Sequence, residues 1–179
     1  MDKKFVLWIS KLRTKRLNSL MIFITHLGTG AFVWLLMSFF FYFTGKKELS
    51  MNIIFALFIN GIVCNLTLKP ILRRKRPSWI DKVELLIKNP TDFSFPSGHT
   101  TSSFAAATTI FLYFKGIGIF FLFLAFLIGF SRVYHFVHYP SDVIVGAILG
   151  ILIANISYEL FYNYIFEILN SRALILILN

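Results

Sequence analysis

The sequence predicts an all-α fold: an integral membrane helical bundle with about five transmembrane helices and an N-terminal interfacial helix. Hydrophobic residues make up 57% of the 179 residues, the mean hydropathy is +0.74, and only 15% are charged. Soluble domains are about 45–50% apolar. Five apolar stretches alternate with polar connections. Segments in lipid must be helical, because open strands would leave backbone groups unpaired. A chain of this length forms one domain.

The N-terminal segment, residues 1–19, is predicted to lie on the membrane surface. Phe5, Trp8, Ile9 and Leu12 recur at helical spacing, and lysines occupy other positions. This is the pattern of an amphipathic interfacial helix. Its apolar part is too short for the core of a cleavable signal peptide.

The rest of the chain, residues 20–179, is predicted to be one membrane-embedded domain. Its transmembrane helices are expected at 20–43, 51–68, 99–114, 117–133 and 143–161. Several are shorter than the ~20 residues that cross a hydrocarbon core, which packing against neighbours and polar ends can compensate. The tail after residue 161 is too polar and short to predict a sixth span. We interpret six glycines as close-packing points between helices: Gly28, Gly30, Gly61, Gly129, Gly146 and Gly150.

Counting the spans places three polar motifs on one membrane face. The second span ends at Lys69, the third begins at His99, and the fourth and fifth meet between residues 132 and 142. These motifs are far apart in the sequence, and we expect them to converge at one membrane surface.

The first motif is the basic run from Lys69 to Arg76, which precedes a proline. Lys69 would supply a point charge and Arg76 a planar bidentate group, and both suit a phosphoryl group. The alternative interpretation is a juxtamembrane basic patch that contacts anionic lipids.

The second motif is Pro96-Ser97-Gly98-His99, immediately before an apolar stretch. Ser97 is expected to cap the helix. Gly98 lets the backbone approach an anion at the helix start. His99 at that position could donate a proton to a departing alkoxide. The same string also occurs as a plain cap and turn.

The third motif, Ser131-Arg132-x5-His138-x3-Asp142, carries the most chemical information. Pro140 should begin the last helix and place Asp142 in its first turn. From there the carboxylate can reach back to His138. It would fix the tautomer of the imidazole and leave the other nitrogen free to attack phosphorus.

A metal site is the alternative chemistry for residues of the third motif. His135, His138 and Asp142 have plausible spacing for a metal site, but two-metal phosphatases need several converging carboxylates. We therefore expect no metal, with fixed cations in its place.

The net charge of +10 does not indicate a nucleic-acid partner, because the basic residues lie between apolar spans. Membrane lipids and phosphorylated substrates explain that charge. His26 is interpreted as structural and Cys64 as a buried thiol.

Together, Lys69-x6-Arg76-Pro77, Pro96-Ser97-Gly98-His99 and Ser131-Arg132-x5-His138-x3-Asp142 resemble the signature motifs of the type 2 phosphatidic acid phosphatase superfamily. The resemblance covers a motif core of about residues 51–162. It implies a helical bundle that hydrolyses lipid phosphates without a metal or other cofactor, through a phosphohistidine. It implies three catalytic residues, with His138 as nucleophile, Asp142 as its orienting group and His99 as general acid. The phosphate-binding residues it implies are Lys69, Arg76, Ser97, Gly98 and Arg132.

The implied substrate is a phosphorylated lipid, and a polyprenyl (undecaprenyl) diphosphate is favoured. Phosphatidylglycerophosphate and phosphatidic acid are the alternatives, and a catalytically silent scaffold or transporter is the alternative of another class. Soluble haloperoxidases share these motifs, but five apolar spans argue against that branch. The oligomeric state is not predicted.

Two arguments about the side of the cell membrane on which the site lies conflict. Of the 18 Lys and Arg residues, only Lys46, Lys47, Lys115 and Arg172 fall on the face opposite the motifs. The positive-inside rule would therefore place the site in the cytoplasm. Bacterial relatives that process carrier lipids usually work on the outer face. We expect an outward-facing site, because a surface helix and a lipid-phosphate entrance attract cations on either side.

Overall fold

The computed structural model describes residues 2–81 and 83–165, and all regular elements in these ranges are helices. The prediction of an all-α protein is therefore confirmed. In chain order the elements are α1 (Asp2–Ser10), α2 (Lys15–Leu27), the 3-10 turn η1 (Thr29–Ala31), α3 (Phe32–Phe43), α4 (Lys47–Asn60), the π-helix η2 (Gly61–Leu68), α5 (Lys69–Leu72), α6 (Pro77–Ile80), α7 (Gly98–Tyr113), α8 (Lys115–Tyr134), α9 (Pro140–Leu160) and the π-helix η3 (Phe161–Ile165).

Among the described residues, three helical stretches are long and apolar enough to cross a membrane. They are Lys47–Ile80, Lys115–Tyr134 and Pro140–Tyr164, and α2 with α3 makes a fourth if the bent pair counts as one span. The protein is therefore an integral membrane protein by composition and helix length. The predicted span at 99–114 corresponds to α7, which has only 16 residues. The count of five spans stays a prediction.

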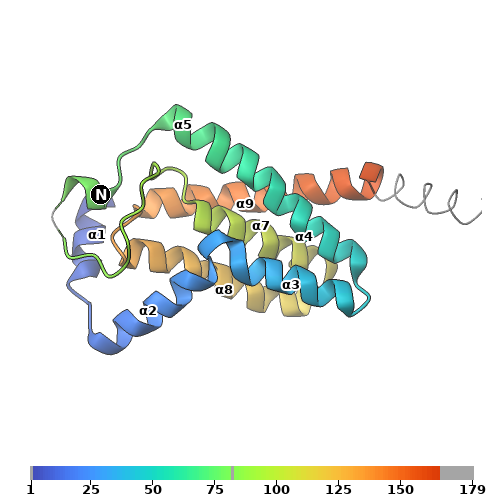
Figure 1. The fold of residues 1–179 in the computed structure, drawn as a ribbon, viewed down its shortest axis with the longest axis horizontal. Coiled ribbons are helices and arrows are strands. Elements are labelled where there is room, and N and C mark those ends of the chain that lie inside the picture. The colour runs from blue at the N-terminus through green and yellow to red at the C-terminus, as the bar shows by residue number, and fades with distance from the viewer. Residues whose placement is uncertain (1, 82, 166–179) are drawn as a thin grey trace, which may run out of the picture.

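Helix α7 lies at the centre of the bundle, in contact with α4, α8 and α9 (Figure 1). Small residues cover its length, and Ala105, Ala106 and Ala107 have no exposed surface. The indole Nε1 of Trp34 on α3 donates to the Ser103 hydroxyl of α7 at 3.0 Å. Because protein surrounds α7, its length need not match the thickness of the bilayer.

The predicted continuous span at 20–43 is wrong in one respect, since it is two helices bent by 55°. The break lies at Gly30 and Ala31, whose φ angles are 59° and 57°. Two successive residues in the left-handed region cannot continue a right-handed helix. The bend brings residues 28–31 beside the start of α7.

Four of the six glycines are close-packing points, as predicted. A Cβ atom at Gly28, Gly129, Gly146 or Gly150 would lie within 3.1 Å of another residue. Gly30 and Gly61 do not fit this interpretation, because a Cβ at either would meet nothing within 4 Å. Gly30 instead serves the positive φ angle of the break.

Helix α1 has one face against the protein and one exposed face. Val6 and Ile9 are buried, while Phe5 and Trp8 are 44% and 54% exposed. Ile9 therefore belongs to the protein core and not to the predicted membrane-facing set. The exposed aromatic face suits an interfacial helix, and its contact with a membrane stays a prediction.

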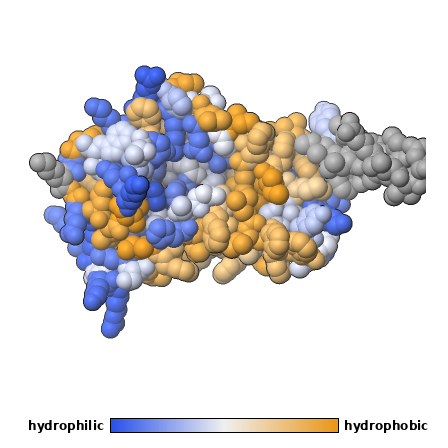
Figure 2. All heavy atoms as spheres, in the orientation of Figure 1, coloured by the Kyte–Doolittle hydropathy of each residue, from blue (hydrophilic) through white to orange (hydrophobic). Residues whose placement is uncertain are grey.

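Hydrophilic side chains gather at one end of the molecule, around α1, the connection after α5 and the turn before α9 (Figure 2). Apolar side chains cover the middle of the bundle. The ends of α5, α7 and α8 that carry the three motifs lie at this hydrophilic end (Figure 1). The motifs therefore converge as the span count predicted.

Candidate active site

Three buried cations from separate parts of the chain surround His138. Lys69 follows η2, Arg76 precedes α6 and Arg132 lies in the last turn of α8. Their exposed fractions are 7%, 2% and 4%. We call Lys69, Arg76 and Arg132 the cation cluster. Buried cations need anionic or hydrogen-bonding partners, so the cluster is built to hold negative charge.

Arg132 is the member of the cation cluster with unused binding capacity. Its Nη1 donates to Thr25 Oγ1 at 2.6 Å. Its Nε is buried and has no hydrogen-bond partner within the described part of the chain. A buried N–H without a partner is costly, and an anion bound at this point would satisfy it. Thr25 carries no signal in the sequence that could have identified it.

His138 and Asp142 lie together at the start of α9, as predicted. Asp142 occupies the first turn, and its Oδ2 accepts from the backbone N–H of Tyr139 at 2.8 Å. The same oxygen is 3.4 Å from His138 Nδ1. The backbone N–H of His138 donates to the Arg132 carbonyl at 3.3 Å. The imidazole is therefore held between the end of α8 and the cap of α9.

The contacts of His138 select one tautomer of its ring. Nε2 is 2.9 Å from Arg76 Nη1, and a guanidinium can only donate. Nε2 must therefore accept, and the ring proton must lie on Nδ1 toward Asp142. Burial, and after it the charges of Arg76, Arg132 and Lys69, lower the pKa of His138 well below 6.5. The ring is neutral at ordinary pH, with the lone pair of Nε2 facing the cation cluster.

Two residues that the sequence reasoning did not select complete this pair. Ser94 is fully buried, donates to Asp142 Oδ2 and lies 3.4 Å from His138 Nδ1. Arg74 Nη1 donates to Asp142 Oδ1 at 2.6 Å, and its guanidinium lies over the Tyr139 ring at 4.2 Å. Ser94 lies just before the second motif and Arg74 lies inside the first. This nearness to the motifs is the only feature of the sequence that could have identified them as site residues. Together they occupy both oxygens of Asp142.

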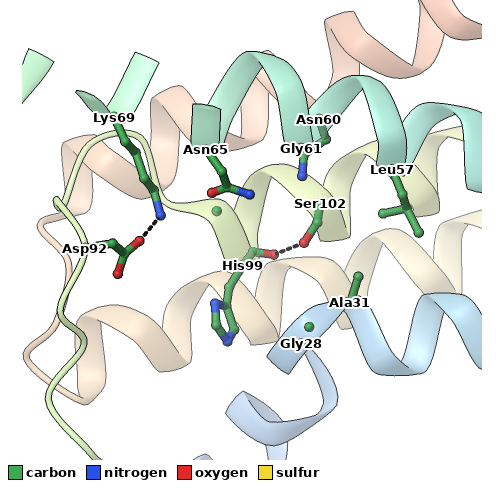
Figure 3. Close-up of a pocket in the computed structure, with 12 residues that line it drawn as sticks. Gly28, Ala31, Leu57, Asn60, Gly61, Asn65, Lys69, Asp92, His99 and Ser102 are labelled. Atoms are coloured by element: carbon green, nitrogen blue, oxygen red, sulfur yellow. Dashed lines mark hydrogen bonds and ion pairs between the residues drawn. The ribbon is translucent and has the colours of Figure 1, made fainter. Parts of the chain in front are cut away.

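His99 lines a cavity of about 400 Å³ beside the cation cluster. In Figure 3 its ring points away from α4 toward the segment around Gly28, while Lys69 and Asp92 lie at the other end of the cavity. The His99 Nε2 atom is 3.4 Å from Thr29 Oγ1, in the break between α2 and α3. The bend in the first span therefore forms one wall of the site.

Ser97 and Gly98 join the start of α7, which carries His99, to the start of α9, which follows His138. The backbone N–H of Ser97 donates to the Asp142 carbonyl at 3.1 Å. A Cβ at Gly98 would lie 3.3 Å from Lys69 Nζ, so the glycine allows the lysine to approach. Ser97 occupies the cap position of α7, but its side chain makes no cap hydrogen bond. Its hydroxyl accepts instead from Thr100 Oγ1 at 2.9 Å.

The alternative metal site does not gather in the described ranges 2–81 and 83–165. No group of three His, Cys, Asp or Glu side chains in them is close enough to hold a metal ion. His135 is fully buried, and neither of its ring nitrogens has a hydrogen-bond partner there. His138 and Asp142 are instead engaged by Arg76 and Arg74.

Comparison with known proteins identifies the family of the chain. The model of the PAP2 superfamily matches residues 49–166. An undecaprenyl-diphosphatase of Sulfolobus acidocaldarius is 32% identical over 147 residues, which cover 80% of this chain and 70% of that protein. Phosphatidylglycerophosphatase B of Bacillus subtilis is 32% identical over 79% of this chain and 74% of its own length. The bacitracin transport permease protein BcrC of Bacillus licheniformis is 47% identical over 42% of this chain, but only 37% of that protein is covered.

A solved structure shares the fold. The crystal structure of Aquifex aeolicus LpxE superposes with a TM-score of 0.75, at 31% identity, over 87% of this chain and 93% of that one. The family match covers more than half of the chain, and two of the relatives named above, the undecaprenyl-diphosphatase and phosphatidylglycerophosphatase B, are phosphatases by name. The chain therefore belongs to the PAP2 superfamily, as a membrane-embedded hydrolase.

Proposed function

We propose that this enzyme cleaves its lipid phosphate through a phosphohistidine on His138, without a metal. The observation that carries the proposal is the direction in which Nε2 of His138 points. The contacts with Arg76 and Asp142 favour a neutral ring whose Nε2 lone pair faces the cation cluster. A nucleophile aimed at an anion-binding pocket is the arrangement that covalent catalysis requires.

In the first half-reaction, the hydrogen bond that Nε2 of His138 accepts from Arg76 Nη1 breaks. The freed lone pair of Nε2 attacks phosphorus while the bond from phosphorus to the lipid oxygen breaks. The bound phosphoryl anion offsets the neighbouring cations and favours the protonated form of His99. His99 then gives its proton to that oxygen, which leaves as an alcohol or as a lipid monophosphate. Asp142 stabilises the positive charge that develops on the His138 ring. The cation cluster compensates the charge on the phosphoryl oxygens, which is the largest contribution in such preorganised sites.

In the second half-reaction, His99 removes a proton from water. The resulting hydroxide attacks the phosphorus atom, the bond between phosphorus and Nε2 breaks, and inorganic phosphate leaves. His99 ends protonated and His138 neutral, so the cycle closes. Lys69, Arg76, Ser97, Gly98 and Arg132 bind the phosphoryl oxygens throughout.

We further propose a polyprenyl diphosphate, such as undecaprenyl diphosphate, as the substrate. The similarity to the undecaprenyl-diphosphatase over 80% of this chain supports this choice. Phosphatidylglycerophosphate is the second candidate, supported by the similarity to phosphatidylglycerophosphatase B. The open lining of the cavity by Gly30, Ala31, Leu57 and Gly61 suits a lipid that arrives from the side of the bundle.

The test is phosphate release by the purified protein in detergent, with EDTA present. Undecaprenyl diphosphate, phosphatidylglycerophosphate and phosphatidic acid are compared at equal mole fractions. We expect activity with the chelator, the highest rate on the diphosphate, and an acid-labile phosphoryl adduct in wild type. His138→Gln should lose the adduct, while His26→Gln, at an exposed histidine, should keep it. Loss of activity with EDTA, or an adduct in His138→Gln, would contradict the mechanism.

We propose that the site faces outward. In a Cys64→Ser background, single cysteines at Lys88 and Lys46 report the two ends of the molecule, because both positions are exposed. An impermeant maleimide added to intact cells should label position 88 and not position 46. The reverse pattern would show that the positive-inside rule governs this protein.

A further inference from the structure

The carboxylate of Asp92 lies on the cation cluster, where the phosphoryl group is proposed to bind. Its Oδ2 contacts Lys69 Nζ, and its Oδ1 is 2.7 Å from Arg76 Nη2. Figure 3 shows the first of these contacts at one end of the cavity. A single carboxylate thus bridges two of the three cations. No step of the proposed mechanism uses this residue.

The surroundings of Asp92 allow its side chain to leave while its backbone stays. The side chain is 51% exposed, whereas those of Lys69 and Arg76 are 9% and 2% exposed. Arg76 also holds the backbone, because its Nε donates to the Asp92 carbonyl at 2.7 Å and its Nη2 to the Phe93 carbonyl at 3.3 Å. A rotation of the Asp92 side chain alone would therefore free both cations.

The other donors of Arg76 are committed to the protein. Nη1 donates to the Val137 carbonyl at 2.8 Å and lies against His138 Nε2. The contact from Nη2 to Asp92 Oδ1 is therefore the one that an incoming anion can replace without disturbing the backbone. A phosphoryl group has three oxygens, so it could take both contacts of Asp92 and also reach the Nε of Arg132, which has no partner among the described residues.

The Asp92 carboxyl is an anion at neutral pH. Burial by itself opposes its ionisation, but the hydrogen bonds and charges of Lys69 and Arg76 outweigh burial and lower the pKa of this carboxyl from 3.8 to about 2. It therefore competes with phosphate as a full charge.

We propose that Asp92 is an exchangeable internal anion: it occupies Lys69 and Arg76 in the empty enzyme, yields them to the substrate phosphoryl group, and returns to displace inorganic phosphate. This rests on the proposed function, because it takes the cation cluster as the phosphate site. An internal competitor lowers the apparent affinity of every anion in proportion to the fraction of time that the site is open. The effect is most visible for a free phosphate ion, because a lipid substrate has a tail that adds affinity. Asp92 would thus reduce product inhibition.

The test compares Asp92→Asn with Asp81→Asn. The first variant keeps the shape of the side chain and removes its charge. The second removes the same charge from the same connection, at a residue that pairs with Lys3 at 2.9 Å and not with the cation cluster. Inorganic phosphate and vanadate are the probes, and their binding is measured by the rise in the unfolding temperature and by inhibition constants.

We expect Asp92→Asn to bind phosphate and vanadate about 10- to 100-fold more tightly than wild type, the range that charged hydrogen bonds span. Asp81→Asn should stay within about twofold of wild type, as for a screened surface pair. If the role of Asp92 were purely structural, Asp92→Asn would lower the affinity for phosphate and vanadate, because a disordered cation cluster would bind anions more weakly. Weaker or unchanged binding in Asp92→Asn would overturn the proposal. Asp92→Glu keeps the charge, and its affinities for phosphate and vanadate should remain near those of wild type.

The two proposals fail separately. Binding of phosphate needs no lipid, so tighter binding in Asp92→Asn would support the exchange even if no tested lipid were hydrolysed, and the missing hydrolysis would count against the proposed function. Conversely, a wild type that hydrolyses lipid phosphates while Asp92→Asn binds phosphate no more tightly would retain the function and remove the exchange.

Discussion

The packing of α9 on α7 gives a prediction that can be worked out from atomic positions. In Gly150→Ala, the new Cβ would lie 2.5 Å from the Thr101 carbonyl oxygen, 2.8 Å from Phe104 Cβ and 2.9 Å from the Ala105 nitrogen. Two of these three atoms belong to the backbone of α7, so no change of rotamer can move them. An ordinary contact begins at 3.4 Å, and the helices must therefore separate by about 0.9 Å.

The expected cost follows from that separation. Overpacking of a close interface costs about 1–3 kcal/mol, and the rigid backbone contact puts this case near the upper value. Alanine is a better helix former than glycine by about 0.5–1 kcal/mol, which offsets part of the cost. A net destabilisation of about 2 kcal/mol remains, which corresponds to a fall in Tm of about 4–8 °C for a chain of this size.

The assay is thermal unfolding of the detergent-solubilised protein, with phosphatase activity measured on the same samples. Gly116→Ala is the matched control, because a Cβ there would meet nothing within 4 Å. Its Tm should stay unchanged or rise slightly. Activity of Gly150→Ala should also fall below the control at temperatures where both variants are folded, since α7 and α9 join at the site through Ser97 and Asp142. Equal Tm values for the two variants would refute the packing argument.

Three further predictions concern the site. His138→Ala should abolish turnover on every lipid phosphate with little loss of expression, whereas His99→Ala should slow turnover and still form the phosphoryl adduct; comparable residual turnover in both would contradict their separate roles. Arg132→Ala should weaken vanadate inhibition by about 10- to 100-fold, measured against the exposed Arg73→Ala, and unchanged sensitivity would remove Arg132 as a ligand. Since the folded-state pKa of His138 lies well below 6.5, the unfolded chain binds more protons below that pH. The free energy of unfolding should therefore decrease as the pH falls below 6.5, at up to about 1.4 kcal/mol per pH unit. Denaturant titrations should show a shallower decrease in His138→Gln.

The sequence alone determined the class of the fold and the main chemistry of the site. Apolar stretches of near-membrane length can only be helices in lipid, and a proline followed two residues later by an acid marks a helix start. His138 and Asp142 therefore met as predicted, because the contact spans only one helix cap. The one-sided placement of the motifs followed from counting spans.

The tertiary structure decided what depends on contacts between distant segments. Nothing local distinguishes Gly30, which breaks the first span, from Gly150, which packs against α7, because the difference lies in the neighbouring helix and not in the glycine. The same holds for Arg74 on Asp142 and Asp92 on Lys69. Hydropathy and short motifs report how a segment relates to its solvent and to its own backbone. They do not report which side chains of a long polar connection will contact the site, because those contacts form only when the connection folds over the helix ends.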